Sequence, residues 1–194
     1  MWKIANVTLP YDSLLGPTIE TARLILRPPV DADFDGFCAF HADVEAMTYL
    51  GGVATPPVVW RAMRTIAGSW ALDGFGMFSV IEKVSGKWIG RIGPLCPHGW
   101  PDREVGWGLL TKAQGKGYAR EAAIASMDFA CDMLNWETII HTIAPANAPS
   151  AKLANALGSY VMRQAQLPDP FADLFVDVWG QTREEWRENR KKFL

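Results

Sequence analysis

The sequence predicts a mixed α/β fold of about seven strands with flanking helices. Helical patterns dominate the start of the chain, and two apolar runs then flank the glycine-containing turn "VSG". A strand, a helix and another strand follow one another at the centre. The turn predicts an antiparallel hairpin and the central order predicts a crossover, so the sheet combines two kinds of strand pairing.

The first elements are a strand over 22–28, a short helix over 32–42 and a loop over 47–57. Thr55 followed by Pro56 predicts the start of a second helix. The apolar face of that helix recurs at spacings of four, three and four residues, as Val59, Met63, Ile66 and Trp70.

The rest of the chain alternates strands and helices. The apolar and β-branched runs predict strands at 76–83, 87–93, 103–110, 138–144, 160–167 and 174–181. The remaining periodic segments predict helices at 120–134, 148–158 and 182–192. Thr182 and Glu185 have the spacing of a capping box, and Gly158 is placed to end the preceding helix.

Length and composition agree with one domain over 1–194, with an N-terminal arm at 1–20 and a C-terminal helix at 182–194. Hydrophobic residues make up 49% and charged residues 21%, as in ordinary globular proteins. The formal net charge is −2 and the basic residues are scattered, so we expect no nucleic-acid partner.

The three cysteines, Cys38, Cys96 and Cys131, lie far apart and favour neither a disulfide framework nor a metal site. Free thiols fit a reducing cytoplasm. No stretch approaches about 20 apolar residues, and the N-terminus does not resemble a signal peptide. The sequence thus predicts a cytoplasmic protein without a metal or a membrane span.

Residues 114–119, "QGKGYA", join a predicted strand to a predicted helix. Such a turn suits a phosphate, because a helix N-terminus offers free N–H groups and glycine lets an anion approach; a simple tight turn is the alternative. A Walker loop needs Ser or Thr after Lys116, and a dinucleotide fingerprint needs Gly where Arg120 stands. A kinase glycine loop lies in a hairpin, so all three nucleotide motifs are excluded.

The segment "EVGWGLLTKAQGKGYAREAA", followed by a strand and by "NAPSAKLANALG", resembles the GNAT family of acyl-CoA-dependent N-acetyltransferases. The resemblance covers roughly residues 21–187. "TARLILRP" and "KWIGRIG" resemble its branch of ribosomal-protein N-terminal acetyltransferases. The resemblance implies a strongly twisted mixed sheet whose central parallel strands splay apart to admit the pantetheine arm of acetyl-CoA.

The resemblance also implies the coenzyme A site. The turn would surround the pyrophosphate mostly through backbone N–H groups, while Lys116 and Arg120 supply positive charge or are only surface charges. Asn147 would contact the pantetheine arm, although an ordinary N-cap also explains it. The expected cofactor-binding residues are Leu109, Leu110, Gln114, Gly115, Lys116, Gly117, Tyr118, Ala119, Arg120, Asn147 and Ser150.

Glu104, Gly106 and Gly108 share one strand face, which leaves room for a ligand or for close helix packing. Glu104 is the best candidate base for acetyl transfer, since burial in an apolar cleft would raise its pKa. Its alternative role is a strand-edge carboxylate paired with Arg103. His98 is a second candidate base in a loop, and we expect His141 to be structural.

The leaving thiolate needs a proton, and many GNAT members use a tyrosine on the helix after Asn147. The segment "AKLANALG" has none, so Ser150 is the best candidate acid and Tyr160 a poorer one. We expect no cysteine in the site, which favours direct transfer in a ternary complex.

Two long loops that contain proline or glycine, at 47–57 and 164–173, are placed to form the entrance for the acceptor amine. The alternative is that they are only solvated connections. Asp169 and Asp173 could attract a protonated amine, and Tyr49 and Phe171 could cover its apolar part. The sequence therefore predicts an acetyl-CoA-dependent N-acetyltransferase acting on a protein N-terminus or a small amine. A non-catalytic acyl-CoA sensor and an interaction module are the alternatives, and a homodimer stays open.

Overall fold

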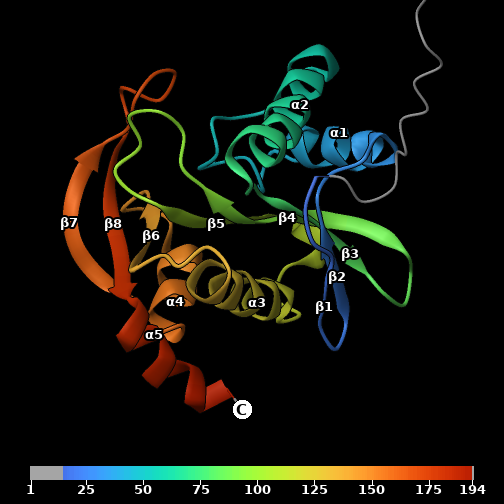
Figure 1. Ribbon diagram of the computed structural model, residues 1–194. Coiled ribbons are helices and arrows are strands. Elements are labelled where there is room, and N and C mark those ends of the chain that lie inside the picture. The colour runs from blue at the N-terminus through green and yellow to red at the C-terminus, as the bar shows by residue number, and fades with distance from the viewer. Residues whose placement is uncertain (1–14, 194) are drawn as a thin grey trace, which may run out of the picture.

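Figure 1 shows the computed structural model, which describes residues 15–193. One eight-stranded sheet runs in the order β1-β2-β3-β4-β5-β6-β8-β7. The strands are β1 (Ile19–Glu20), β2 (Leu24–Arg27), β3 (Phe78–Glu82), β4 (Lys87–Leu95), β5 (Glu104–Leu109), β6 (Thr138–Ile143), β7 (Tyr160–Gln166) and β8 (Phe175–Thr182). The strand beyond the seven predicted is β1, which pairs with β2 at the sheet edge.

Five α-helices cover the sheet, with α1 and α2 on one face and α3, α4 and α5 on the other (Figure 1). Within residues 15–193, no helix is both long and apolar enough to cross a bilayer. Of the predicted arm at 1–20, residues 1–14 lie outside the described part of the chain. The helices are α1 (Phe34–Ala42), α2 (Pro56–Asp73), α3 (Tyr118–Asp132), α4 (Ala148–Ala156) and α5 (Arg183–Arg190).

The sheet is antiparallel except at its centre, where β5 and β6 run parallel. These two strands share one registered pair, Glu104 with Ile140, and the amide of Ile140 donates to the carbonyl of Arg103 at 3.0 Å. On their other edges, β5 pairs with β4 and β6 pairs with β8 over the whole length of β5 and of β6. The predicted mixed fold with separated central parallel strands is confirmed, and the separation lies beyond Glu104.

Two helices are fixed by the apolar faces expected from the sequence. On α2, Val59, Met63 and Trp70 are buried, and the Trp70 ring packs 4.9 Å from the ring of Phe78 on β3. On the opposite face, α3 buries the small residues Ala122, Ala123 and Ala130 together with Met127. The sheet therefore sits between two apolar layers.

Several predicted boundaries shift. The helix predicted at 32–42 begins at Phe34 after a 3-10 turn over Asp31–Asp33, because the buried Asp33 carboxylate binds the guanidinium of Arg27 and the amide of Val30. β4 continues to Leu95 because it stays paired with β5, and α3 begins at Tyr118. The predicted capping box of Thr182 and Glu185 is present.

Candidate active site

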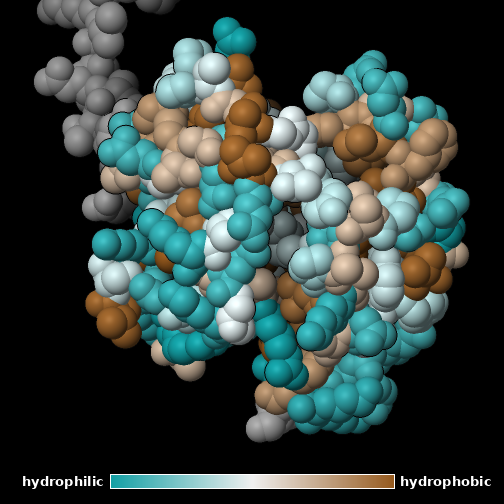
Figure 2. All heavy atoms as spheres, turned by 180° about the vertical axis from the view of Figure 1, so that it is seen from behind, coloured by the Kyte–Doolittle hydropathy of each residue, from teal (hydrophilic) through white to brown (hydrophobic). Residues whose placement is uncertain are grey.

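A cavity of about 930 Å³ lies where β5 and β6 separate. Its walls come from β4, β5 and β6, from α2 and α4, and from the loops around residues 47–54, 96–100 and 167–174. Seen from behind, the surface is hollowed along a groove between two halves of the molecule (Figure 2). The cavity therefore joins the face covered by α1 and α2 to the gap between the parallel strands.

Glu104 begins β5 and is 6% exposed. Its carboxylate accepts hydrogen bonds from the indole N–H of Trp100 at 2.6 Å and from the amide and hydroxyl of Thr142 at 3.1 and 2.8 Å. Burial raises the pKa of Glu104 to about 7, and the three hydrogen bonds oppose the rise. The carboxylate thus exchanges a proton near neutral pH, as a general base requires.

The alternative partner of Glu104, Arg103, is turned away. Its guanidinium lies 5.9 Å from the ring centre of Trp136, and the three donors to Glu104 come from other residues. Glu104 therefore lines the cavity as a carboxylate held only by neutral groups.

The two glycines of β5 differ in role. A Cβ on Gly108 would lie 2.7 Å from the ring of Phe40, so this glycine admits close packing of α1. A Cβ on Gly106 would lie 3.0 Å from Leu95 and 3.4 Å from Oε1 of Glu104, and Gly106 lines the cavity. Only Gly106 therefore serves the ligand space directly.

Ser150 lies on α4 at the wall of the cavity. The indole N–H of Trp107 donates to its Oγ at 3.1 Å, and the Asn147 side chain accepts from its amide at 3.2 Å, as an N-cap does. Because Oγ already accepts from Trp107, the serine hydroxyl proton is free to point toward a ligand. Asn147 lines the same cavity.

The turn before α3 has the backbone that an anion site needs. Gly115 and Gly117 have φ of +72° and +79°, a region that glycine adopts readily, and Gly117 is the N-cap of α3. The first-turn amides of α3 have no intrahelical acceptors. Arg23 supports the turn: it donates to the carbonyl of Lys116 at 2.9 Å and pairs with Glu121 at 2.6 Å.

Most side chains of the other predicted cofactor residues are engaged within the protein. Leu109 and Leu110 are buried core residues, each 5% exposed, and the side-chain amide of Gln114 donates to the Leu109 carbonyl at 3.1 Å. The Tyr118 hydroxyl donates to Glu82, and the guanidinium of Arg120 lies over Phe193. The structure brings Ala119 into the first turn of α3 and leaves Lys116 exposed beside it.

Of the four acceptor residues predicted, the structure brings two to the cavity. Tyr49 and Phe171 line it, and the Tyr49 hydroxyl donates to the Ala146 carbonyl at 3.0 Å. A Cβ on Gly51 would lie 3.0 Å from the Phe171 ring, so the two loops meet across the entrance. Asp169 and Asp173 are not among the lining residues.

Two histidines behave differently. His98 lines the cavity from an exposed loop. His141 is 1% exposed between the Val105 carbonyl, 2.7 Å from Nδ1, and the Ser159 hydroxyl, 3.1 Å from Nε2. Burial lowers the pKa of His141 to about 4, which keeps the ring neutral and suits a structural role.

The expectation that no cysteine lies in the site is wrong, because Cys96 lines the cavity. The loop after β4 folds back over the cavity and carries Cys96 with it. Burial, followed by the nearby charge of Asp102, raises the pKa of this thiol. A raised pKa disfavours the thiolate, so Cys96 is a poor nucleophile.

The sequence analysis missed four residues of the site: Arg91, Trp100, Trp107 and Thr142. Each contacts a partner through strand pairing or loop closure, and Thr142 is 38 residues from Glu104 in the chain. The predicted strand face of Glu104 and Gly106 indicates that the carboxylate needs hydrogen-bond donors. It does not identify which residues supply them. Among the described residues, no group of three or more His, Cys, Asp or Glu side chains gathers as a metal site.

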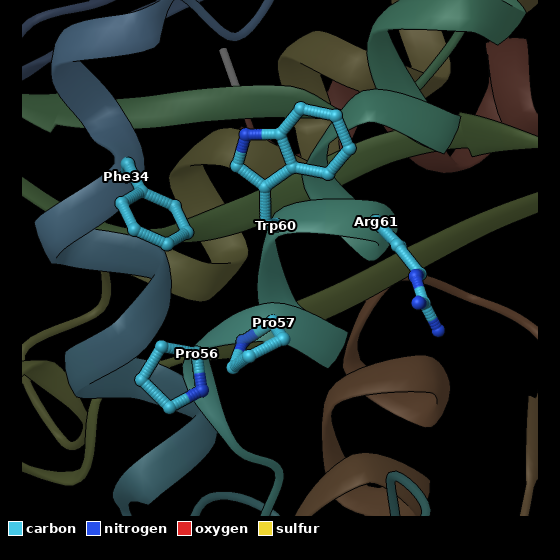
Figure 3. A pocket seen from close by; sticks show the side chains of 5 residues that line it. All are labelled: Phe34, Pro56, Pro57, Trp60 and Arg61. Atoms are coloured by element: carbon cyan, nitrogen blue, oxygen red, sulfur yellow. The ribbon is translucent and has the colours of Figure 1, made fainter.

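A second hollow, of about 440 Å³, lies outside the sheet between α1 and α2 (Figure 3). It is lined by Phe34, Pro56, Pro57, Trp60 and Arg61 and has an almost wholly apolar wall. It contains none of the groups that hold or surround Glu104, so the chemistry belongs to the larger cavity.

Residues 23–159 match the model of the acetyltransferase (GNAT) domain, which is more than half of the chain. This chain belongs to the GNAT acetyltransferase family. It is therefore an acyltransferase, and proteins of the GNAT family use acetyl-CoA as co-substrate and act on an amine acceptor.

Relatives agree with the GNAT assignment. The chain is 32% identical over 143 residues to the uncharacterized N-acetyltransferase p20 of Bacillus licheniformis, covering 72% of this chain and 80% of that one. The crystal structure of an acetyltransferase from Agrobacterium tumefaciens matches with a TM-score of 0.75 and 30% identity, over 93% of this chain and 99% of that chain. A ribosomal-protein-S5-alanine acetyltransferase from Vibrio fischeri has a TM-score of 0.65 at 20% identity, over 88% and 98% of the two chains, and shares the fold.

Proposed function

We propose that this GNAT enzyme transfers an acetyl group from acetyl-CoA directly to a primary amine, within a ternary complex. The observation that supports this most is the position of Glu104, a buried carboxylate of pKa about 7 at the point where β5 and β6 separate. An amine must lose a proton as it is acetylated, and a base that titrates near neutral pH suits that task.

The turn before α3 and the residues of the gap together fit the donor substrate. The left-handed glycines Gly115 and Gly117 and the first-turn amides of α3 would hold the pyrophosphate, as helix N-termini hold anions. Asn147 and the unpaired backbone groups facing the gap would hold the pantetheine amides. Bound acetyl-CoA supplies the reactive thioester.

The proposed transfer balances with the groups present. The amine nitrogen bonds to the acetyl carbonyl carbon, the carbon–sulfur bond breaks, and the amine proton passes to Glu104. The Ser150 hydroxyl, oriented by Trp107, donates a proton to the leaving sulfur directly or through water. A thiolate leaves readily, so a weak acid suffices there.

The acceptor remains open between a protein N-terminus and a small amine. The sequence resemblance to the ribosomal-protein branch supports testing peptides that begin as ribosomal proteins do. The roles predicted for Asp169 and Asp173 as long-range attractors of a cationic amine stay predictions, since neither lines the cavity.

Release of free thiol from acetyl-CoA, measured over a panel of amines and peptides, tests the proposal. We expect thiol release that requires both an amine and Glu104. Acetyl-CoA binding without thiol release on any acceptor would support the non-catalytic sensor instead. Absence of any coenzyme A affinity would favour the interaction module.

A further inference from the structure

Arg91 places a cation in the cavity without a matching anion. It lies on β4 opposite Gly108, and its guanidinium is 5.8 Å from the ring centre of Phe40 on α1. It therefore faces the side of the sheet that α1 and α2 cover, and it lines the cavity. Among residues 15–193, no carboxylate lies within ion-pair distance of it.

The hydrogen bonds of this guanidinium are also incomplete. Nη1 donates to the sulfur of Met77 at 3.1 Å, which is a weak acceptor, and the buried Nε has no partner among the described residues. Burial lowers the pKa of Arg91 to about 10, so the side chain is still charged at neutral pH. Arg91 as a whole is half-buried, and a cation with incomplete hydrogen bonds gains from an anionic partner.

The neighbouring His41 does not supply that partner. It is buried, its Nδ1 lies 2.9 Å from the Phe37 carbonyl, and it also lines the cavity. Burial lowers the pKa of His41, and the charge of Arg91 adds to the effect. A neutral imidazole beside Arg91 leaves the positive charge uncompensated.

Arg91 and Glu104 face one cavity from two ends. Glu104 lies four residues before Gly108 on β5, a distance of roughly 13 Å along the strand. Met77 lies between them: its sulfur contacts Arg91, and its methyl group is 3.7 Å from the position of a Cβ on Gly106, beside the Glu104 carboxylate. A ligand with its amine at Glu104 would thus extend over Met77 toward Arg91.

We infer that the acceptor is a small amine that also carries a carboxylate, bound with its amine at Glu104 and its carboxylate at Arg91. The inference rests on the proposed function, because it identifies the class of amine that the same site acetylates. Arginine binds a carboxylate through two parallel N–H bonds, which fixes the orientation of the ligand. The Met77 side chain between the charges favours an amine and a carboxylate separated by several bonds. A second positive charge on the acceptor would be repelled by Arg91.

The test compares two series of acceptors, unbranched ω-amino acids of increasing length and the plain alkylamines of the same lengths. Thiol release gives kcat/KM for each pair, and the ratio within a pair measures the preference for the carboxylate. We expect the wild-type enzyme to prefer an amino acid of intermediate length. In Arg91→Met that ratio should fall about 10- to 100-fold, the range of a charge-assisted hydrogen bond.

Two further variants make the comparison specific. Arg91→Lys keeps the charge and should retain part of the preference, and it replaces Arg91→Met if that variant does not fold. Arg61→Met removes an exposed arginine of α2, outside the cavity, and should leave the ratio unchanged. Calorimetry with the preferred amino acid alone gives a binding readout that does not require turnover, and Arg91→Met should abolish this binding.

The outcomes separate the two proposals. Equal kcat/KM for amino acids and alkylamines in the wild type, or an unchanged ratio in Arg91→Met, would overturn the inference while acetyl transfer stands. Binding of the amino acid that depends on Arg91, without thiol release from any amine, would support the inference and overturn the proposed function. No binding of any amino acid in calorimetry, together with no preference in turnover, would overturn the inference.

Discussion

Thr142 donates two hydrogen bonds to Glu104, one from its backbone amide at 3.1 Å and one from its hydroxyl at 2.8 Å. The two residues stand on the separating strands β6 and β5. Burial raises the pKa of the Glu104 carboxyl, and these bonds limit the rise because they favour the charged form. Thr142 thus tunes the pH at which the proposed base accepts a proton.

Thr142→Val should move the acidic limb of the pH profile. The proposed base must be deprotonated, so kcat/KM of the wild type should rise with pH around a midpoint near 7. The variant loses the hydroxyl donor but keeps the amide, so the Glu104 pKa should rise further, by about one unit for one hydrogen bond. Thr138→Val, the same change on the same strand, is the control. A limb at the same pH in Thr142→Val would contradict the tuning.

Glu104→Gln should keep acetyl-CoA binding and lower kcat by about 10²- to 10⁴-fold, the usual effect of losing an essential general base. Steady-state kinetics and cofactor titration on one preparation separate the two quantities. An unchanged kcat over the whole pH range would remove Glu104 from the mechanism and favour His98 or water.

The raised pKa of Glu104 also predicts a stability effect. The folded protein holds this proton more tightly than the unfolded chain does, so the contribution of Glu104 to stability falls as pH rises from about 4.5 to about 7. Above that window the loss is complete, of the order of 3 kcal/mol for a shift of this size. The melting temperature of Glu104→Gln relative to wild type should therefore increase between pH 4.5 and 8. A constant difference would mean that the carboxylate is not desolvated as the structure indicates.

Gly117→Asp should abolish the increase in melting temperature that acetyl-CoA gives by binding the folded state. A side chain and a negative charge would enter the proposed pyrophosphate site. Gly74→Asp is the matched control, because Gly74 has φ of +76° at the end of α2, on the opposite face of the sheet from α3. A folded Gly117→Asp protein with an undiminished shift would show that the junction is only a turn.

Ser150→Ala should lower kcat with little change in acetyl-CoA affinity, by about 10-fold if water replaces the hydroxyl as proton donor. Trp107→Phe removes the group that orients the hydroxyl and should reproduce part of the loss. If kcat is the same in Ser150→Ala as in wild type, the leaving sulfur takes its proton from elsewhere.

The sequence predicted the features that local chemistry determines. The left-handed turn at Gly115 and Gly117 follows from the need for glycine there, and the box of Thr182 and Glu185 follows from their spacing. The turn and the capping box each depend only on residues that are close together in the sequence. The strand–helix–strand order at the centre could also be predicted, because apolar residues alternate along a strand and recur about every 3.6 residues along a helix.

The features that tertiary pairing determines could not be predicted. Thr142 reaches Glu104 only because β6 runs parallel to β5, and Arg91 faces the same cavity only because β4 pairs with β5 in one register. The strand predicted at 87–93 was expected to stop before Pro94, yet Pro94 is paired with Val105. The two-residue strand β1 is too short to leave a periodic pattern.

The single pair of Glu104 and Ile140 makes this sheet two smaller sheets that share one pivot. One comprises β1 to β5, and the other comprises β6, β8 and β7. Side-chain contacts also join the two parts across the gap, from His141 to the Val105 carbonyl and from Trp107 to Ser150. The proposed base stands where the two parts meet, so the same junction that ends the gap also fixes the position of the carboxylate that would receive the proton.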